Sequence, residues 1–212
     1  SPKGLYAELV RLHKEEGLSF KNVISFNLDE YYPMKAASIH SYVRFMNEQL
    51  FDHIDILKEN IYIPDGTLEK NEIAAFCKEY EAAIERVGGI DLQVLGIGGN
   101  GHIGFNESGS LQNSRTRLVA LDHSTRIAAS KEFEGLKNTP RTAITLGVNK
   151  IMDAKRVILL AWGESKSAIV AKAVEEGMTN LVPASFLQEH QQVDFILDKE
   201  ASSNLTRINK PW

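Results

Sequence analysis

The sequence has few of the residues that mark secreted, membrane or nucleic-acid-binding proteins. Its 212 residues include one cysteine, Cys77, so an internal disulfide is excluded. No apolar run is long enough to cross a bilayer, and no leader peptide is recognisable. The formal net charge is −4, and no basic cluster is long enough to form a nucleic-acid-binding surface. We therefore expect a protein of the reducing cytoplasm that binds a small molecule, and neither nucleic acid nor a membrane.

The composition that remains is that of an ordinary globular protein, with 43% hydrophobic and 25% charged residues. Strand-like runs alternate with helix-like runs along the chain. The strand-like runs cover 23–27, 92–96, 118–121, 142–146, 157–162 and 193–197, and the helix-like runs cover 38–51, 69–87, 125–133 and 164–175. This order predicts an α/β fold, with an open, mostly parallel sheet and helices on both faces.

The chain starts directly on a helical pattern. Ser1 is a natural N-cap and Pro2 suits the first helical position. Leu5, Leu9 and Leu12 follow at helical spacing. We therefore expect residues 1–212 to form a single domain that lacks its N-terminal strand and helix.

The most informative segment is LGIGGNGHIGFNE, at residues 95–107. Five glycines fall within nine residues, with His102 among them and Glu107 just after them. Glycine allows sharp turns and a close approach of backbone to ligand, and histidine transfers protons near neutral pH. The run DLQVL at 91–95 predicts a short buried strand that leads into this turn. The segment therefore indicates a site for chemistry on a small polar ligand.

Three polar clusters follow strand-like runs. They are Asp29 with Glu30, then Asn100 with His102 and Glu107, and then the segment 163–166, which ends in Lys166. Ligands of open α/β sheets bind at the carboxyl ends of the strands, so these clusters are expected to share one site. A lysine at a helix N-terminus suits a phosphate, and carboxylates with an imidazole suit proton transfer. The pattern predicts proton-transfer chemistry on a phosphorylated small molecule.

Each cluster also has an ordinary structural interpretation. Asp29 and Glu30 could cap the next segment, and His102 could be a hydrogen-bonded residue of a turn. Lys166 alone is typical of solvated helix surface. The prediction therefore depends on the clusters meeting at one edge of the sheet.

Two segments, FNLDEY at 26–31 and the glycine-rich segment at 95–107, resemble the signature segments of the glucosamine-6-phosphate deaminase family. Further similarity lies at 114–117, 125–126, 143–147 and 163–166, so the resemblance covers essentially the whole chain. It implies a Rossmann-like sheet and a reaction in which glucosamine 6-phosphate and water give fructose 6-phosphate and ammonia. It also implies that no metal and no organic cofactor takes part.

The resemblance further implies catalytic roles. His102, oriented by Glu107 and Asn100, is expected to open the sugar ring. Asp29 is expected to take the C2 proton and pass it toward C1. Some members of the family have aspartate where this chain has Asn100, which can offer only hydrogen bonds.

The substrate phosphate is expected to bind Ser1, Lys166 and Lys131. In the family it lies on a glycine-rich loop, of which this chain keeps Ser1. Lys131 stands at the family's arginine position and keeps the charge without the two-pronged guanidinium.

Other functions stay open on the sequence alone. One is a different sugar-phosphate isomerase or a lactonase on the same fold, which would release no ammonia. Another is a non-catalytic sugar-phosphate-binding domain, which would bind glucosamine 6-phosphate without turnover. A metallohydrolase built on Asp29, His102 and Glu107 is a weaker alternative, because their spacing is unfamiliar for metal ligands. We also expect a homo-oligomer.

Overall fold

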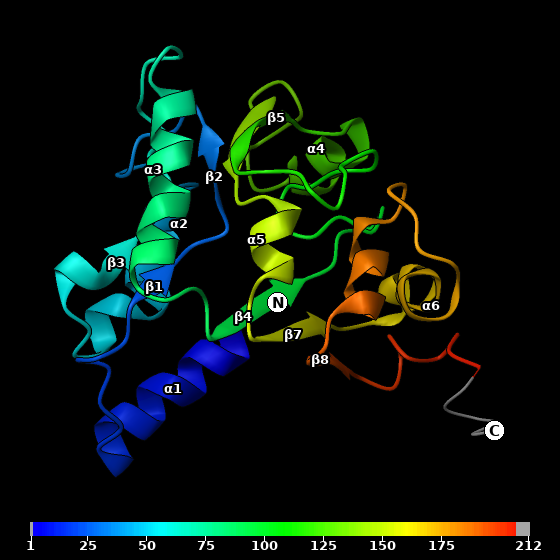
Figure 1. The fold of residues 1–212 in the computed structure, drawn as a ribbon, viewed down its shortest axis with the longest axis horizontal. Coiled ribbons are helices and arrows are strands. Elements are labelled where there is room, and N and C mark those ends of the chain that lie inside the picture. Colours follow the sequence, from blue (N-terminus) through cyan, green and yellow to red (C-terminus); the bar gives the residue numbers. More distant parts are fainter. Residues whose placement is uncertain (1, 207–212) are drawn as a thin grey trace.

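The computed structural model describes residues 2–206, and its helices and strands alternate over most of that range (Figure 1). The α-helices are α1 (Lys3–Glu16), α2 (Tyr42–Gln49), α3 (Ile73–Arg86), α4 (His123–Ala129), α5 (Val148–Met152) and α6 (Ser167–Glu175). The strands are β1 (Ser25–Phe26), β2 (Asp29–Tyr32), β3 (Ile61–Tyr62), β4 (Leu92–Gly96), β5 (Arg117–Ala120), β6 (Thr142–Thr145), β7 (Arg156–Ala161) and β8 (Val193–Leu197). The predicted α/β class is confirmed by this order.

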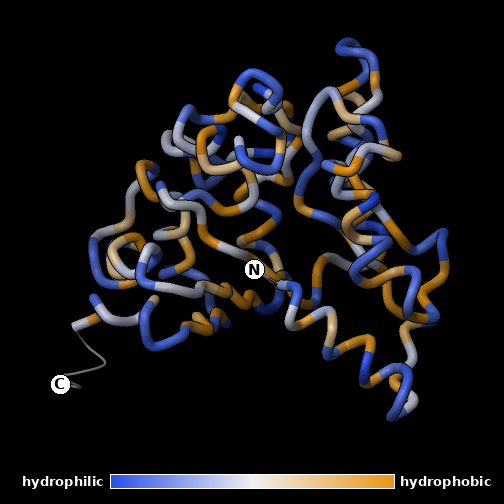
Figure 2. Tube along the Cα trace, turned by 180° about the vertical axis from the view of Figure 1, so that it is seen from behind, coloured by the Kyte–Doolittle hydropathy of each residue, from blue (hydrophilic) through white to orange (hydrophobic). Residues whose placement is uncertain are grey.

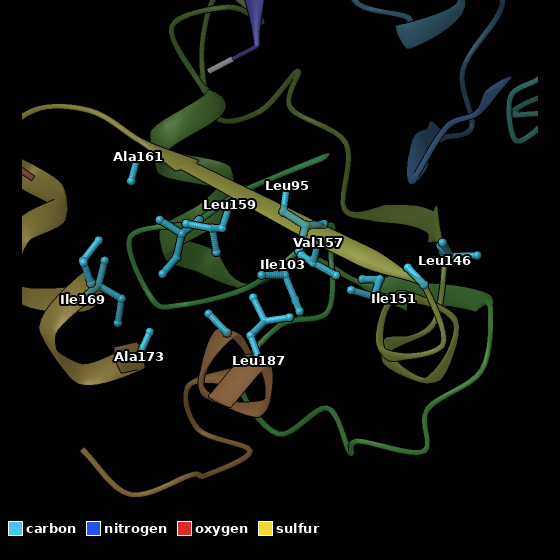
Figure 3. Close-up of a cluster of buried hydrophobic side chains, with 14 of the residues drawn as sticks. Leu95, Ile103, Leu146, Ile151, Val157, Leu159, Ala161, Ile169, Ala173 and Leu187 are labelled. Atoms are coloured by element: carbon cyan, nitrogen blue, oxygen red, sulfur yellow. The ribbon is translucent and has the colours of Figure 1, made fainter. Parts of the chain in front are cut away.

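The main sheet is parallel, with the strand order β4–β7–β8. Figure 3 shows the largest core cluster packed around β7. Val157 and Leu159 of β7 are fully buried beside Leu95 of β4, and Ile151 of α5 and Ile169 of α6 close the flanks. Each such side chain contributes about 1.5–3 kcal/mol when buried. The cluster therefore fixes the carboxyl end of β4, where the glycine-rich segment begins.

A second sheet corrects part of the sequence prediction. Strands β2, β6 and β5 pair antiparallel in that order, and the register sets Asp29 opposite Thr145. The predicted strand at 23–27 is reduced to β1, which pairs with β3. Asp29 and Glu30 therefore lie within a strand and not in a loop after one. Acidic residues are depleted in strands, and the pairing with β6 overrides that preference.

The helices begin and end within a few residues of their predicted bounds. The helix expected at 38–51 begins at Tyr42, because the Ser41 side chain accepts a hydrogen bond from the Val43 amide as its N-cap. The pattern at 164–175 divides into a 3₁₀ turn, Glu164–Lys166, and α6. Helix α1 begins at Lys3 with Pro2 as the residue before it, and the expected cap at Ser1 lies outside the described residues.

The elements gather into two groups in Figure 1. Helices α2 and α3 lie with β1, β2 and β3 on one side, and β4, β7 and β8 lie with α5 and α6 on the other. Helix α1 packs on α2 through an apolar cluster that includes Tyr6, Leu9 and Met46. Figure 2 shows hydrophilic residues at many of the outermost turns of the chain. Within residues 2–206, no helix has both the length and the apolar character needed to cross a membrane.

Candidate active site

A cavity of about 410 Å³ is lined by residues from both groups of elements and from α4. Its walls come from β2, the segment after β4, α2, α4 and the 3₁₀ turn before α6. The lining residues are Leu28, Asp29, Tyr31, Tyr42, Gly96, Ile97, Gly98, Gly99, Asn100, His102, Gly104, Phe105, Ser124, Thr125, Ala128, Ala129, Glu132 and Lys166. The sequence prediction that Asp29, Asn100, His102 and Lys166 share one edge agrees with this lining.

The glycine-rich segment folds into a turn under the His102 ring. The Gly98 amide donates to the His102 carbonyl at 2.9 Å, and the Gly101 amide donates to the Gly98 carbonyl at 3.0 Å. A Cβ on Gly98 would overlap the imidazole ring of His102. Gly101 has φ of +85°, a conformation that L side chains rarely adopt. The turn therefore needs glycine at both positions to hold His102 at the cavity.

His102 forms a tight group with Glu107 and Asn100. Its ring Nδ1 lies 3.0 Å from Glu107 Oε2, and the Asn100 side-chain amide donates to the same oxygen at 2.8 Å. Burial by itself raises the pKa of Glu107, but hydrogen bonds from His102, Asn100 and Thr125 lower it to about 2. Since an ionised carboxylate can only accept, Nδ1 carries a proton and Nε2 is left as the basic nitrogen.

Thr125 and Asp122, the residue before α4, complete this group. The sequence analysis included Thr125 only in a segment of family similarity, without a role, and did not identify Asp122. The Thr125 hydroxyl lies 3.3 Å from His102 Nδ1, and the Asp122 amide donates to Glu107 Oε1 at 3.2 Å. Asp122 is also the N-cap of α4. A short polar side chain directly before a helical pattern could have predicted that Asp122 is an N-cap. No local pattern could have predicted its hydrogen bond to Glu107.

Asp29 faces the cavity from β2 in a poorly hydrated position. Burial first, and then the charge of Glu30, raise the pKa of Asp29 to about 7. No group among residues 2–206 donates a hydrogen bond that would lower it. A carboxyl group with a pKa near neutrality can both accept and return a proton at physiological pH.

Glu30 points to the opposite side of β2, because successive side chains of a strand alternate between faces. It is 1% exposed. Its carboxylate accepts hydrogen bonds from the Ser41 hydroxyl at 2.6 Å and from the Tyr31 amide at 2.9 Å. Of the two acidic residues, Glu30 therefore has the capping role, at the start of α2, while Asp29 lines the cavity.

The strand that carries Asp29 and the segment that carries His102 meet at one contact. Thr145 lies opposite Asp29 in the register, and its hydroxyl accepts a hydrogen bond from the Phe105 amide at 3.0 Å. A Cβ on Gly104 would lie 3.1 Å from that hydroxyl and 3.4 Å from Asp29 Oδ2. Gly104, with φ of +56°, therefore lets the segment that carries His102 approach the strand that carries Asp29 closely.

Aromatic rings form one wall of the cavity beside Asp29. The Tyr31 and Tyr42 rings stack at 5.4 Å, and the Phe105 ring lies 5.2 Å from Tyr31. Burial and the charge of Asp29 raise the pKa of Tyr42 well above its ordinary value. The sequence analysis did not single out these rings, since an isolated tyrosine carries no pattern that distinguishes a cavity wall from core.

The predicted phosphate ligands have different positions. Lys166 lines the cavity, and its ammonium group donates to the Ile97 carbonyl at 2.7 Å. Burial lowers the pKa of Lys166. Lys131 is exposed and does not line the cavity, although its neighbour Glu132 does. Ser1 lies outside the described residues. Roles in phosphate binding stay a prediction for all three.

The arrangement joins a basic imidazole nitrogen, a carboxyl group that titrates near neutrality and a half-buried ammonium group in one cavity. Such a set can move protons on a small anionic molecule. Among residues 2–206, no three His, Cys, Asp or Glu side chains converge closely enough to hold a metal ion.

Comparison with known proteins confirms the family predicted from the motifs. The model of the family described as glucosamine-6-phosphate isomerases/6-phosphogluconolactonase matches residues 1–196. A glucosamine-6-phosphate deaminase of Clostridium botulinum is 44% identical over 205 residues, which cover 97% of this chain and 83% of that protein. One of Shewanella halifaxensis is 47% identical over 206 residues, which cover 97% and 78%.

A longer relative matches the whole chain. A glucosamine-6-phosphate deaminase-like protein of Bacteroides thetaiotaomicron is 52% identical over 212 residues, and the chain spans 32% of its length.

Solved structures give the same result for the fold. A monomeric glucosamine-6-phosphate deaminase superposes with a TM-score of 0.92 at 41% identity, covering 96% of this chain and 83% of that one. The 6-phosphogluconolactonase of Trypanosoma brucei superposes with a TM-score of 0.74 at 22% identity, covering 97% and 82%. The second match supports the shared fold alone.

Proposed function

The chain belongs to the glucosamine-6-phosphate isomerase/6-phosphogluconolactonase family, and from this we propose that it converts glucosamine 6-phosphate and water to fructose 6-phosphate and ammonia. One observation carries the proposal, namely that Asp29 and His102 line the same cavity from different segments of the chain. An isomerisation that follows ring opening needs two proton-transfer groups, and these two side chains supply them.

The first step opens the pyranose ring. His102 Nε2 takes the proton of the O1 hydroxyl and returns it to the ring oxygen as the C1–O5 bond breaks, which leaves an aldehyde at C1. Glu107 keeps Nδ1 protonated through the 3.0 Å contact, so Nε2 remains available as the base. Asn100 donates to the same carboxylate oxygen and fixes its position.

The second step moves the carbonyl group from C1 to C2. Asp29 removes the proton from C2 while the substrate's own ammonium group gives up a proton to the C1 aldehyde oxygen, which leaves an enolamine with a hydroxyl group at C1. Asp29 then delivers its proton to C1, which gives a protonated imine at C2. Water adds to the imine and ammonia leaves, so that the ketone of fructose 6-phosphate remains. Asp29 suits this step because its pKa of about 7 allows both proton acceptance and proton return.

Lys166 binds the substrate phosphate in this proposal. Its ammonium group lies in the cavity and is held by the Ile97 carbonyl. Among residues 2–206, it forms no ion pair that would neutralise its charge. Lys131 and Ser1 are proposed as further phosphate ligands on the family resemblance alone.

The test is to measure ammonia and fructose 6-phosphate released from glucosamine 6-phosphate. We expect equal amounts of the two products, no effect of a metal chelator, and loss of both products in the Asp29→Asn variant. Release of a ketose phosphate without ammonia would favour another isomerase. Binding of glucosamine 6-phosphate without turnover would favour a non-catalytic binding domain.

The deaminase function has more support than the lactonase alternative. The relatives at 44% and 47% identity carry the deaminase name, whereas the lactonase of Trypanosoma brucei is 22% identical. A direct comparison of ammonia release with hydrolysis of a 6-phosphogluconolactone separates the two activities in one preparation.

We also propose that the protein acts in a reducing cytoplasm, which its single buried cysteine supports. The expected homo-oligomer stays a prediction. Mass measurement by light scattering decides it, and the solved deaminase at 41% identity is described as monomeric.

A further inference from the structure

A second buried carboxylate, Glu30, lies directly behind the proposed base and has no part in the proposed mechanism. It is 1% exposed, and charged side chains are rarely buried to this extent without a specific partner. Among residues 2–206, Glu30 forms no ion pair. All of its hydrogen bonds come from a hydroxyl group and backbone amides.

These hydrogen bonds join β2 to the first turn of α2. Glu30 Oε2 accepts the Ser41 hydroxyl at 2.6 Å and the Val43 amide at 3.3 Å, and Oε1 accepts the Tyr31 amide at 2.9 Å. Ser41 is fully buried and is the N-cap of α2. The next residue, Tyr42, stacks on Tyr31 and lines the cavity. One carboxylate therefore ties the strand that carries Asp29 to the helix that carries the aromatic wall.

We propose that Glu30 is a positioning residue, which holds β2 against the N-terminus of α2 so that Asp29 and Tyr42 face the substrate from fixed places. The proposal rests on the proposed function, because it assigns Glu30 to the same proton-transfer step. A base displaced by a fraction of an ångström loses much of its rate.

The charge of Glu30 gives the proposal a second, measurable effect. Asp29 and Glu30 are like charges on neighbouring residues, and the charge of Glu30 adds to burial in raising the pKa of Asp29. Burial also raises the pKa of Glu30, and the hydrogen bonds from Ser41 and the α2 amides oppose that rise.

Other titratable groups around Asp29 come from every element packed against it. They are Tyr6 of α1, Tyr42 of α2, Tyr80 of α3, Tyr31 of β2 itself, and His102, Glu132 and Lys166 of the cavity. The charge of Glu30 also contributes to the raised pKa of Tyr31 and of Tyr42, so Glu30→Gln removes a charge that acts on these two tyrosines as well as on Asp29.

The test compares Glu30→Gln with Glu48→Gln, which makes the same substitution at an exposed position of α2. In Glu30→Gln, the acid limb of the kcat/KM profile is expected to move to lower pH by roughly half a unit to one unit, because a like charge is removed. At the plateau, kcat is expected to fall roughly tenfold with little change in KM. Glu48→Gln is expected to match the unaltered protein.

A second measurement does not depend on turnover. With ¹³C-labelled aspartate carboxyl groups, the Asp29 resonance is identified by its loss in Asp29→Asn, and its titration midpoint is expected to fall in Glu30→Gln. An unchanged midpoint together with an unchanged plateau kcat would overturn the proposal. If the unaltered protein releases no ammonia, the proposed function fails, and the Asp29 midpoint still tests the effect of Glu30.

Ser41→Ala tests the tether while keeping both carboxylates, and it also serves if Glu30→Gln does not fold. Removal of the hydroxyl breaks the 2.6 Å hydrogen bond, so the plateau kcat is expected to fall by several-fold. Ser38→Ala, a few residues earlier and outside the tether, is the control. Equal kcat in the two alanine variants would refute the positioning role.

Discussion

At the scale of the residue, the proposed chemistry depends on which nitrogen of His102 carries the proton. Glu107 is held ionised by its three side-chain donors, with a pKa of about 2. It therefore accepts the Nδ1 proton wherever the pH lies well above 2. This carboxylate therefore determines that Nε2, and not Nδ1, is the basic nitrogen of His102.

Glu107→Gln tests that dependence. The amide keeps the shape but loses the charge, and its NH₂ group can turn toward Nδ1 and reverse the tautomer. We expect kcat/KM to fall by about 10–100-fold, the loss that is typical when a partner that orients a metal-binding histidine is removed. Steady-state kinetics measures the loss, and Glu59→Gln, at an exposed position, is the control. A loss of less than twofold would show that Glu107 does not orient His102.

Lys166→Ala tests the phosphate contact. The ammonium group is half-buried and burial lowers its pKa, so its loss removes a charged donor that bulk water replaces poorly. We expect KM for glucosamine 6-phosphate to rise roughly 10–100-fold, since a hydrogen bond to a charged group is worth about 1.5–3 kcal/mol. Lys172→Ala, at an exposed position of α6, the helix that follows Lys166, should leave KM unchanged. If KM changes equally in both variants, the phosphate binds elsewhere.

At the scale of the element, the glycine-rich turn and β2 show how far sequence reasoning reaches. The turn could be predicted, because glycine spacing and an upstream apolar strand are local patterns. The place of Asp29 within β2 could not, since it depends on pairing with Thr145 far along the chain. The links from Thr125 and Asp122 to Glu107 were missed for the same reason. The residues around Glu107 in the sequence give no sign of which distant segment will donate hydrogen bonds to it.

The turn allows a direct steric test. Gly98→Ala places a methyl group where the His102 ring lies, whereas a methyl group on Gly99 meets no atom within 4 Å. We expect Gly98→Ala to reduce kcat by about 100-fold through displacement of the ring, and Gly99→Ala to cause a much smaller loss. Kinetics and circular dichroism of both variants measure the effect. Equal activity in the pair would mean that the turn does not position His102.

At the scale of the whole molecule, the proposed base opposes folding. The pKa of Asp29 is raised from its ordinary 3.8 to about 7. Between these pH values, the folded protein keeps a proton that the unfolded chain has lost. The stability of the fold therefore falls as the pH rises through this window, and the cost is fully present above pH 7.

Asp29→Asn removes that cost along with the base. We expect its free energy of unfolding to exceed that of the unaltered protein by about 2–4 kcal/mol at pH 8, and the difference to vanish near pH 4. Urea denaturation at the two pH values measures it. Asp52→Asn, at an exposed position, should show no such pH dependence. A difference of equal size at both pH values would contradict the assignment of the raised pKa to Asp29.

The contact of Gly104 with Thr145 and Asp29 also bears on the order in which the protein gains activity as it refolds. Asp29 takes its place in the cavity that His102 also lines only after β2 has paired with β6, and that pairing closes a long loop. Non-local pairing of this kind is slow relative to helix formation. Catalytic turnover should therefore return later than the helical circular-dichroism signal during refolding. The time at which activity returns would then report when the last long-range contacts have formed.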